Sequence, residues 1–501
     1  MAEKQDFNQF LDTKKVLNLQ MTHPETDKVE KMELLLFLIL KRKQMEHLFT
    51  PISFIIHELI SNANKANMCR VFFRLNGISP EKPKDYASGM KKFEFVYQED
   101  PDSLLKYVEQ YGMFLKASFQ EYGDNCFHFS VANNAPVAKE NIIVTEDNLS
   151  ELDFKKNQMQ KIMDKIKQFE KVKHDFDKFN ELVASEENEG LGLLFALKLL
   201  DNIGIPSNSL AYDFDEFMTI AKLKFNYNEV SPPAYSVLAE AILKEVEVLP
   251  QFAENINALI SKLSQGEVDI NEVAEDIERD PGLAGDMLKL VNSAKFMLNR
   301  KIASIKESIN YVGIQGLKDL LYSYGAMKVL NDKYGEIQEI WEHSHKTATI
   351  AAKLVHIKNL ATKADEYYAA GLLHDIGKII VLGLDKDMAG KISDFCASRQ
   401  VEMPIMEDIM MGLSHAKIGG KIAEHWGFPP SLISAIKYHH EPAIPDDYKE
   451  LNYTIYLSNY FANLKPGNYG LLSDIDIRIK SFFNIKDQNQ LELLIKKLDA
   501  Y

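Results

Sequence analysis

The chain has 501 residues, a net charge of −15, 46% hydrophobic residues and 26% charged residues. This length exceeds a single hydrophobic core, so we expect two or three domains of ordinary globular composition. The acidic balance disfavours broad binding to nucleic acids or acidic membranes, although it allows a local basic patch. Cys69, Cys126 and Cys396 are too widely spaced for a disulfide framework or a CxxC zinc pattern, and they fit a reducing cytoplasm.

Residues 1–50 have helical patterning and no chemical signature. The first ten residues are charged and lack the apolar core of a signal peptide. The apolar run Leu34–Leu40 is much shorter than the ~20 residues of a membrane-spanning helix, so it predicts a core helix. His23 could be proposed as a phosphoacceptor, but the next residue, Pro24, argues against a mid-helix site and favours an ordinary surface histidine. We expect a cytoplasmic protein without a membrane segment.

Residues 51–70 predict an amphipathic helix, because apolar residues recur at helical spacing from Ile52 to Ala63. Glu58, Asn62 and Lys65 share another face at i, i+4 and i+7. A carboxylate, an amide and an ammonium group together could position water, bind Mg²⁺ and contact phosphate. On spacing alone, a solvated helix face is the simpler interpretation.

The letters HELISNANKA at 57–66 resemble the N-box helix of the histidine-kinase-type ATPase family. The resemblance implies that Asn62 holds Mg²⁺ and that Glu58 lies near the attacking water. After this helix we predict strands at Val71–Leu75, Phe93–Tyr97 and Phe127–Val131, and a helix over Leu104–Phe119.

The loop at 131–137 corresponds by resemblance to the adenine-binding loop of that family. Asn133 stands where the family has an Asp that recognises adenine, and Ala135 and Val137 replace two glycines. An Asn can still offer its amide to a purine, but the loop has lost its flexible positions.

The charged segment Lys155–Ser185 occupies the place of the family's variable lid. Gly190 and Gly192 then precede a predicted helix at Leu194–Asn202, where bare backbone N–H groups could bind phosphate. Strands at Leu210–Phe214 and Phe217–Phe225 would complete the sheet.

The resemblance therefore predicts an N-terminal α+β sandwich over residues 51–230, a degenerate histidine-kinase-type ATPase-like domain. Its implied cofactor is Mg-ATP. A phosphoacceptor helix pair is not evident, so we expect a nucleotide-binding or partner-binding module and not a working kinase. The candidate nucleotide-binding residues are Glu58, Asn62, Lys65, Asn133, Gly190 and Gly192.

A domain boundary is predicted at Ser231–Ala234, because SPPA cannot continue a strand or a helix. From Val237 onward the pattern is helical. Asp280 and Pro281 form a good helix start, with a carboxylate N-cap and Pro at the first position. The stretches DPGLAGDMLKLVNSA (280–294) and KESINYVGIQGL (306–317) resemble the HDOD family, a divergent branch of the HD-domain superfamily in bacterial signalling proteins. The resemblance spans about residues 237–460 and implies an all-helical bundle. A DNA-binding helix-turn-helix is the alternative, which the acidic surroundings disfavour.

GLLHDIGK at 371–378 places His374 and Asp375 side by side within an apolar run. Such ligands suit Zn, Fe, Mn or Ni, and two metals about 3.5–4 Å apart can clamp a phosphoryl group and activate water. The alternative is a buried histidine cluster that satisfies itself within the core. Carried over from the ligand order of HD-type phosphohydrolases, the predicted metal ligands are His343, His374, Asp375, His415, His439 and His440.

Two departures from the HD pattern weaken a two-metal site. The final Asp of the family should fall within 456–460, where Asn459 stands instead. The GYP motif is absent after His440. One transition metal, Fe, Mn or Zn, could still bind. If the domain is active, the catalytic residues would be His374, Asp375 and Lys378, the last of which could contact a phosphate or lie on the surface.

We therefore predict a helical segment at 1–50, an ATPase-like domain at 51–230, an HDOD domain at 235–465 and packing helices at 466–501. The leading functional hypothesis is a bacterial signal-transduction protein whose HDOD domain is a regulatory binding or scaffold module with an ATPase-like input domain. The alternative is a metal-dependent phosphohydrolase or phosphodiesterase acting on nucleotides or cyclic dinucleotides. Expected partners are signalling proteins, with a nucleotide or cyclic-dinucleotide ligand and a homodimer as further options, and neither DNA nor a membrane.

Overall fold

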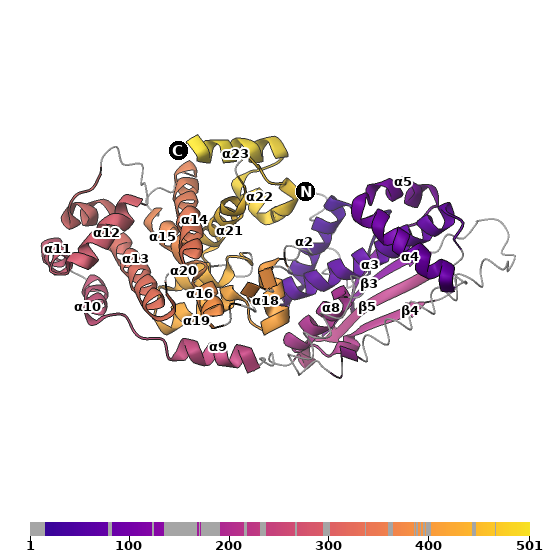
Figure 1. Ribbon diagram of the computed structural model, residues 1–501, viewed down its shortest axis with the longest axis horizontal. Coiled ribbons are helices and arrows are strands. Elements are labelled where there is room, and N and C mark those ends of the chain that lie inside the picture. The colour runs from indigo at the N-terminus through magenta and orange to yellow at the C-terminus, as the bar shows by residue number, and fades with distance from the viewer. Residues whose placement is uncertain are drawn as a thin grey trace. The chain divides into compact units, whose positions relative to one another are not determined.

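A computed structural model divides the chain into two compact units, Met1–Ser236 and Val237–Tyr501 (Figure 1). The described residues are 16–78, 83–122, 125–134, 168–169, 171, 191–214, 218–230, 237–265, 268–293, 301–335, 337–358, 364–384, 386, 389–390, 392–393, 396, 402–442, 447–465 and 467–500. Most of the predicted lid, and Gly190, lie outside them.

The first unit combines an antiparallel sheet with helices. In the described residues the sheet has five strands in the order β1-β2-β3-β5-β4, each antiparallel to its neighbours. The strands are β1 (Leu17–Met21), β2 (Leu115–Tyr122), β3 (Cys126–Asn134), β4 (Leu210–Phe214) and β5 (Met218–Asn226). The helices are α2 (Thr26–Arg42), α3 (Phe49–Leu75), α4 (Pro83–Glu99), α5 (Asp102–Gln110) and α8 (Leu191–Asn202).

One face of this sheet is buried by helices. Along β2, Leu115, Ala117 and Phe119 are fully buried while the residues between them are not, as period-2 alternation requires. Helix α3 packs along β3 and against α8. The apolar stripe predicted for residues 51–70 therefore lies in the core of the first unit.

Two of the predicted strands are wrong, because both segments are helical. Val71–Leu75 is the last part of α3, and Phe93–Tyr97 lies inside α4. Val71, Phe72, Phe73 and Phe93 belong to one buried cluster. Their aromatic and β-branched side chains suit a strand by propensity, but packing between α3, α4 and α5 decides the outcome.

The helix predicted over Leu104–Phe119 is also too long. Helix α5 ends at Gln110, and β2 begins at Leu115. Gly112 has φ +64°, and the N–H groups of Gly112 and Met113 donate to the carbonyls of Glu109 and Val108. This is a glycine-terminated helix end, which the sequence carried and the prediction overlooked. The predicted strands at Phe127–Val131 and Leu210–Phe214 are confirmed by β3 and β4.

The described residues of the second unit form helices and turns without a strand. The helices are α9 (Val237–Glu247), α10 (Glu254–Leu263), α11 (Ile270–Glu278), α12 (Pro281–Ser293), α13 (Ile305–Tyr334), α14 (Gln338–Ile357), α15 (Ala364–Leu373), α16 (Ile376–Leu384), α18 (Met403–Met411), α19 (His415–His425), α20 (Pro430–Tyr438), α21 (Lys449–Asn463), α22 (Ile477–Phe483) and α23 (Gln488–Ala500). This confirms the helical prediction for the described part of residues 237–501.

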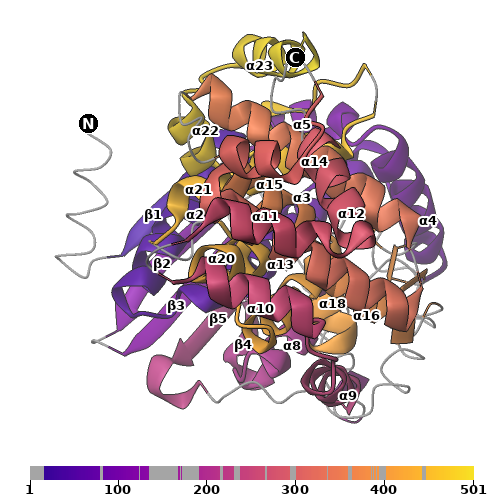
Figure 2. The same cartoon turned by 90° about the vertical axis from the view of Figure 1, so that its left-hand side faces the viewer.

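Helix packing in the second unit centres on α13, α14 and α15. Helices α11 and α12 pack against α13, and they lie together in Figure 2. Helix α14 packs against α15 and α21, and α16 packs against α19. Asp280 caps α12 as predicted, since its carboxylate accepts the N–H of Leu283 at 3.1 Å. These contacts leave the junction between α15 and α16 in the middle of the bundle.

Candidate metal centre

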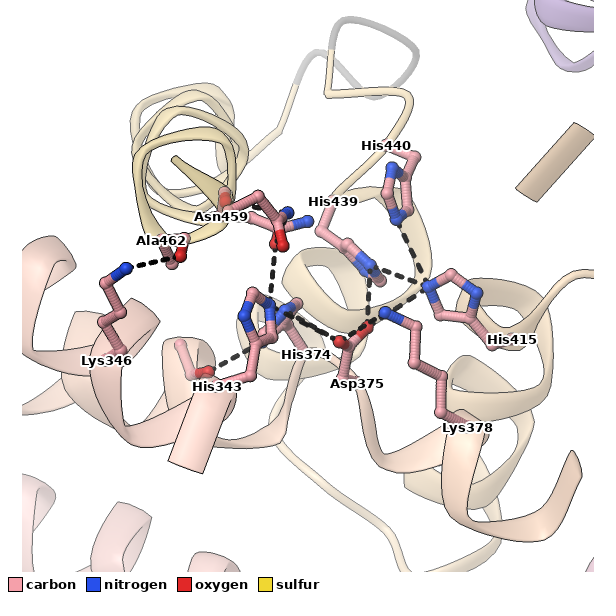
Figure 3. A network of polar contacts seen from close by, with 12 residues as sticks. His343, Lys346, His374, Asp375, Lys378, His415, His439, His440, Asn459 and Ala462 are labelled. Carbon is pink, nitrogen blue, oxygen red and sulfur yellow. Dashed lines mark hydrogen bonds and ion pairs between the residues drawn. The ribbon is translucent and has the colours of Figure 1, made fainter. Parts of the chain in front are cut away.

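Polar side chains from five helical segments converge at the α15–α16 junction (Figure 3). His374 and Asp375 lie at the junction itself, between the buried end of α15 and the mostly buried start of α16. The other side chains come from α14, α19, the end of α20 and α21, namely His343, His415, His439, His440 and Asn459. The structure therefore brings all six predicted metal ligands to one place, together with the Asn at the position of the family's final Asp.

Close helix crossings explain why these residues meet. A Cβ on Gly371 would lie 2.6 Å from Cα of Ala348, so α15 touches the backbone of α14. A Cβ on Gly377 would lie 2.0 Å from the carbonyl oxygen of His415 and 2.7 Å from N of Gly419. Only glycine permits these contacts. The Gly of HDIGK thus brings the start of α19, and with it His415, onto Asp375.

Asp375 divides its two oxygens between two groups of histidines. Oδ2 lies 3.3 Å from Nε2 of His374 and 3.6 Å from Nε2 of His343. Oδ1 lies 3.2 Å from Nε2 of His415 and 3.5 Å from Nε2 of His439. We call the first group the His343 half and the second, which includes His440, the three-histidine half. A single carboxylate can therefore serve ligand positions in both halves.

In the three-histidine half, nitrogen atoms face one another at short range. Nε2 of His415 is 3.2 Å from Nε2 of both His439 and His440. One ligand atom from each of these histidines lies within 4.8 Å of the other two. The same criterion groups His343, His374 and Asp375.

The outer ring nitrogens fix which atoms face inward. Nδ1 of His374 donates to the carbonyl of Gly371, and Nδ1 of His439 donates to that of Ile436, both at 2.7 Å. Nδ1 of His415 lies 2.6 Å from Oε2 of Glu407. A neutral histidine that donates from Nδ1 presents a lone pair at Nε2. All three rings therefore aim lone pairs at the centre.

Lone pairs that face each other require a cation between them. Nε2 of His374 is buried and has no hydrogen-bond partner among the described residues. The Nε2 atoms of His415 and His439 could share one proton, which is the self-satisfied histidine core considered above. A transition metal in either group would satisfy the facing atoms of that group, since imidazole and carboxylate are its usual ligands. The donor set thus fits a metal ion.

Burial and charge set the protonation states of the cluster. Burial lowers the pKa of His439 to about 3 and that of His343 to about 4, so both are neutral at pH 7. Burial would lower the pKa of His415 as well, but Glu407 raises it. Burial would raise the pKa of Asp375, yet His374 and Lys378 lower it well below its usual value. Asp375 is therefore an anion at pH 7, as a metal ligand must be.

Two further residues, Asn459 and Lys378, contact members of the predicted ligand set. Asn459 lies with Oδ1 2.9 Å from Nε2 of His343, so it occupies the place expected for the missing Asp. Lys378 extends its ammonium group to within 2.6 Å of Oδ2 of Asp375. The side chains of Lys378 and His343 are 28% and 20% exposed, whereas those of His374, His415 and His439 are not exposed. His440 in the three-histidine half is also partly exposed, so solvent reaches the cluster at His440 as well as at Lys378 and His343.

Sequence reasoning missed Glu407, which is 3% exposed on α18. Its Oε2 accepts both the backbone N–H and Nδ1–H of His415, at 2.7 and 2.6 Å. The local signal is an acid eight residues before the histidine, with Gly412 between them at φ +82°. That glycine turns the chain after α18, but no known spacing rule points to it.

The candidate nucleotide-binding residues of the first unit have different surroundings. Glu58 on α3 lies against Gly192 on α8, where a Cβ would come within 1.7 Å of Oε2 of Glu58. Burial raises the pKa of Glu58, and His57 partly opposes this. Asn62 is exposed.

Lys65 and Asn133 have partners within the first unit. Nζ of Lys65 lies 2.7 Å from Oε1 of Glu94. Asn133 is 3% exposed, and its amide donates to the carbonyl of Ala63 at 3.3 Å and to Oδ1 of Asn67 at 3.2 Å. In this arrangement the Asn133 amide faces α3.

The apolar run around the metal candidate also has the length and composition of a membrane span. The stretch Ala364–Leu384 passes that test, but 78% of it is buried inside the structure. It contains the α15–α16 junction, so its apolar residues form the core around His374 and Asp375.

Comparison with known proteins identifies the part of the chain that carries this cluster. Residues 249–442 match the HDOD domain family. The second unit contains an HDOD domain. This confirms the resemblance for that range, which includes all six predicted metal ligands and Glu407. Asn459 lies beyond the matched residues.

Similar proteins add the following. An uncharacterised protein of Treponema pallidum is 27% identical over 455 residues, which cover 91% of this chain and 85% of that protein. A Shewanella amazonensis crystal structure, named for a presumed phosphohydrolase, is 24% identical, covers 51% of this chain and 93% of its own, and has a TM-score of 0.42. An HDOD domain protein of unknown function from Geobacter sulfurreducens is 22% identical, covers 52% and 93%, and has a TM-score of 0.41.

Proposed function

We propose that the HDOD domain is a metal-holding binding module of a signal-transduction protein. The observation that carries this proposal is the convergence of inward-facing Nε2 atoms on the two oxygens of Asp375. The ion would be held by His415, His439, His440 and Oδ1 of Asp375. His374 would lie beside the other carboxylate oxygen, Oδ2. The ion would replace the proton that the ligand-free cluster needs.

A binding role is favoured over turnover because most of the proposed ligand atoms are buried in the centre of the cluster. His374, His415 and His439 are each 0% exposed, and Asp375 is 1% exposed. A buried ion ties α15, α16, α19 and α20 together and so stabilises one shape of the bundle. That shape would present surfaces to signalling proteins in the cytoplasm, which is our proposal for the partners.

Phosphoester hydrolysis is the second candidate, because the His343 half of the cluster is partly exposed. The partly exposed Lys378 and His343 lie beside Asp375, where a phosphate group of a nucleotide or cyclic dinucleotide could enter. A bound metal would supply an acidified water and charge stabilisation. Lys378 would hold a phosphate oxygen, and Asp375 would hold the ion.

For the first unit we propose a degenerate ATPase-like input module. The contact between Glu58 and Gly192 supports it, since the resemblance assigns both residues to one nucleotide site. Titration of the full chain with a fluorescent ATP analogue and Mg²⁺ tests this. Binding that weakens at least about tenfold in Asn62→Ala supports a nucleotide role. Absent binding, or binding unchanged in that variant, contradicts it.

Metal analysis tests the main proposal. The purified full chain is stripped with chelator, incubated with Mn²⁺, Fe²⁺ or Zn²⁺ in turn, desalted and analysed for metal. We expect a stoichiometric ion that is lost in His415→Ala and retained in His356→Ala, a histidine at the end of α14 away from the cluster's contacts. A chain that retains no ion under any of these conditions contradicts the proposal.

The loaded protein then separates the two candidates. A binding module should release no more product from a chromogenic phosphodiester or a cyclic dinucleotide than its Asp375→Asn variant does. Hydrolysis well above that of the variant would establish the enzymatic alternative instead.

A further inference from the structure

The two halves of the cluster differ in the charge that they offer a cation. Among the side chains described around it, Asp375 is the carboxylate that both halves share. The three-histidine half has a second carboxylate close by, since Glu407 lies 2.6 Å from the outer nitrogen of His415. The His343 half has the neutral Asn459 instead. Positive charge is therefore better compensated in the three-histidine half.

The orientation of Asn459 follows from its neighbour one turn along α21. Asn463 lies 3.0 Å from the backbone carbonyl oxygen of Asn459, which can only accept, so the facing atom of Asn463 is its NH₂ group. That NH₂ is also 3.1 Å from the side chain of Asn459. The atom that Asn459 presents there must accept, and it is Oδ1.

This orientation fixes the proton on His343. The same Oδ1 of Asn459 lies 2.9 Å from Nε2 of His343. Because an amide oxygen has no proton to donate, Nε2 of His343 must carry one. His343 therefore donates to Asn459 and offers no lone pair at the nitrogen that faces Asp375.

Lys378 forms an ion pair with Oδ2 of Asp375, the carboxylate oxygen of the His343 half. Its Nζ is 2.6 Å from Oδ2 of Asp375, the oxygen that lies nearest to Nε2 of His374. A divalent ion on that oxygen would stand within a few ångströms of the ammonium charge of Lys378, and like charges at that separation repel each other. The lysine thus already supplies a cation where a second metal would bind.

We infer that the chain binds one metal ion, in the half formed by His415, His439 and His440, and that Lys378 supplies the positive charge of the other half. The inference rests on the metal-binding function proposed above. It changes what the site is: a mononuclear centre with a lysine beside it, not a weakened pair of metals. A clamp on a phosphoryl group by two metals is then unavailable in the natural chain.

Metal stoichiometry tests this inference in the full chain. Stripped protein is titrated with Mn²⁺, and bound ion is counted by elemental analysis and examined by electron paramagnetic resonance. We expect one ion with the uncoupled signal of an isolated Mn²⁺ centre. His440→Ala should weaken it by at least tenfold, whereas His343→Ala should retain it. Two ions with a spin-coupled signal, or loss in His343→Ala with retention in His440→Ala, would overturn the inference and leave metal binding itself intact. No ion at all would overturn the proposed function.

Variants of the His343 half provide the second arm. Asn459→Asp with Lys378→Met returns a carboxylate and removes the ammonium group, so we expect a second ion and a coupled signal. Lys421→Met, at an exposed lysine of α19, is the matched control and should bind one ion. The isosteric Asn459→Asp alone should bind a second ion more weakly, and it decides the question if the double variant does not fold. Stoichiometry that stays at one in both folded variants would show that Asn459 and Lys378 are not what prevents the second ion.

Discussion

In the second unit, polar side chains from separate helices direct their inner nitrogen atoms at one carboxylate. In the first unit, comparable side chains form hydrogen bonds or ion pairs with neighbouring residues. His374, His415 and His439 each use one nitrogen to fix the ring and keep the other directed at Asp375. In the first unit, Asn133 donates to α3 and Lys65 pairs with Glu94. Both regions carry motifs that resemble known families.

The difference shows what a motif alone can indicate. Glu58, Asn62 and Lys65 share a face of one helix, and that spacing is also compatible with ordinary surface contacts. The cluster at the α15–α16 junction combines side chains from several helices. These side chains would not converge by chance on one point unless other contacts held each ring in its orientation. Outer hydrogen bonds that orient a ring are therefore stronger support for a binding site than spacing within a helix.

Asp375 is the residue that both halves of the cluster share, so its substitution should have the largest effect on metal binding. Asp375→Asn should weaken metal binding by more than about 100-fold, since loss of an outer-shell partner alone typically costs 10–100-fold. Elemental analysis after dialysis against a metal buffer measures the effect. Asp286→Asn on α12, a partly exposed carboxylate paired with Lys289, is the control and should keep the ion. Equal metal content in the two variants would refute a role of Asp375 as ligand.

Gly377 tests whether the crossing of α16 and α19 assembles the cluster. Gly377→Ala places a methyl group 2.0 Å from the backbone of His415, so the helices must separate. We expect a loss of about 2–3 kcal/mol in stability, as for overpacked cores, together with weaker metal binding. Thermal unfolding of the metal-free chain measures the first effect.

A second helical glycine provides the control for that crossing. Gly285 on α12 has open space where a Cβ would lie. Gly285→Ala should leave the midpoint unchanged or raise it by the equivalent of about 0.5–1 kcal/mol, because alanine is the better helix former. If both substitutions behave alike, close approach at Gly377 is not what assembles the site.

The helical second unit and the residues that meet in the cluster could be predicted from the sequence because each motif is short and local. HDIGK, the histidine pair at 439–440 and Asp280-Pro281 can be recognised within a few residues. Glu407 could not be predicted, since its contact with His415 depends on the turn at Gly412. The strand predictions at Val71–Leu75 and Phe93–Tyr97 failed for a related reason: contacts between α3 and α4 override the propensity of single residues.

Glu407 holds His415 in its orientation through two hydrogen bonds. Glu407→Gln keeps the size of the side chain but removes the charge that strengthens His415 as a ligand. We expect metal affinity to fall about 10–100-fold with little change in the fold, measured by competition with a chromogenic chelator. Asp408→Asn, next to it on α18, should leave affinity unchanged. Weakening that is equal in the two variants would mean that total charge near α18, and not the contact with His415, controls affinity.

Asn133 tests whether the polar side chains of the first unit serve the fold or a ligand. Asn133→Ala removes two buried hydrogen bonds, to Ala63 and Asn67, and should cost about 1–2 kcal/mol. Asn67 keeps a donor in Arg70, at 3.3 Å, which limits the loss. Chemical denaturation followed by the unfolding of the sheet measures this cost, and Asn62→Ala, at an exposed position, is the control for stability. If Asn133 serves the fold, stability falls while affinity for a fluorescent ATP analogue stays the same. If instead stability is unchanged and affinity falls at least about tenfold, Asn133 contacts the nucleotide. The first unit would then resemble the second, because its polar side chains would also be directed at a ligand.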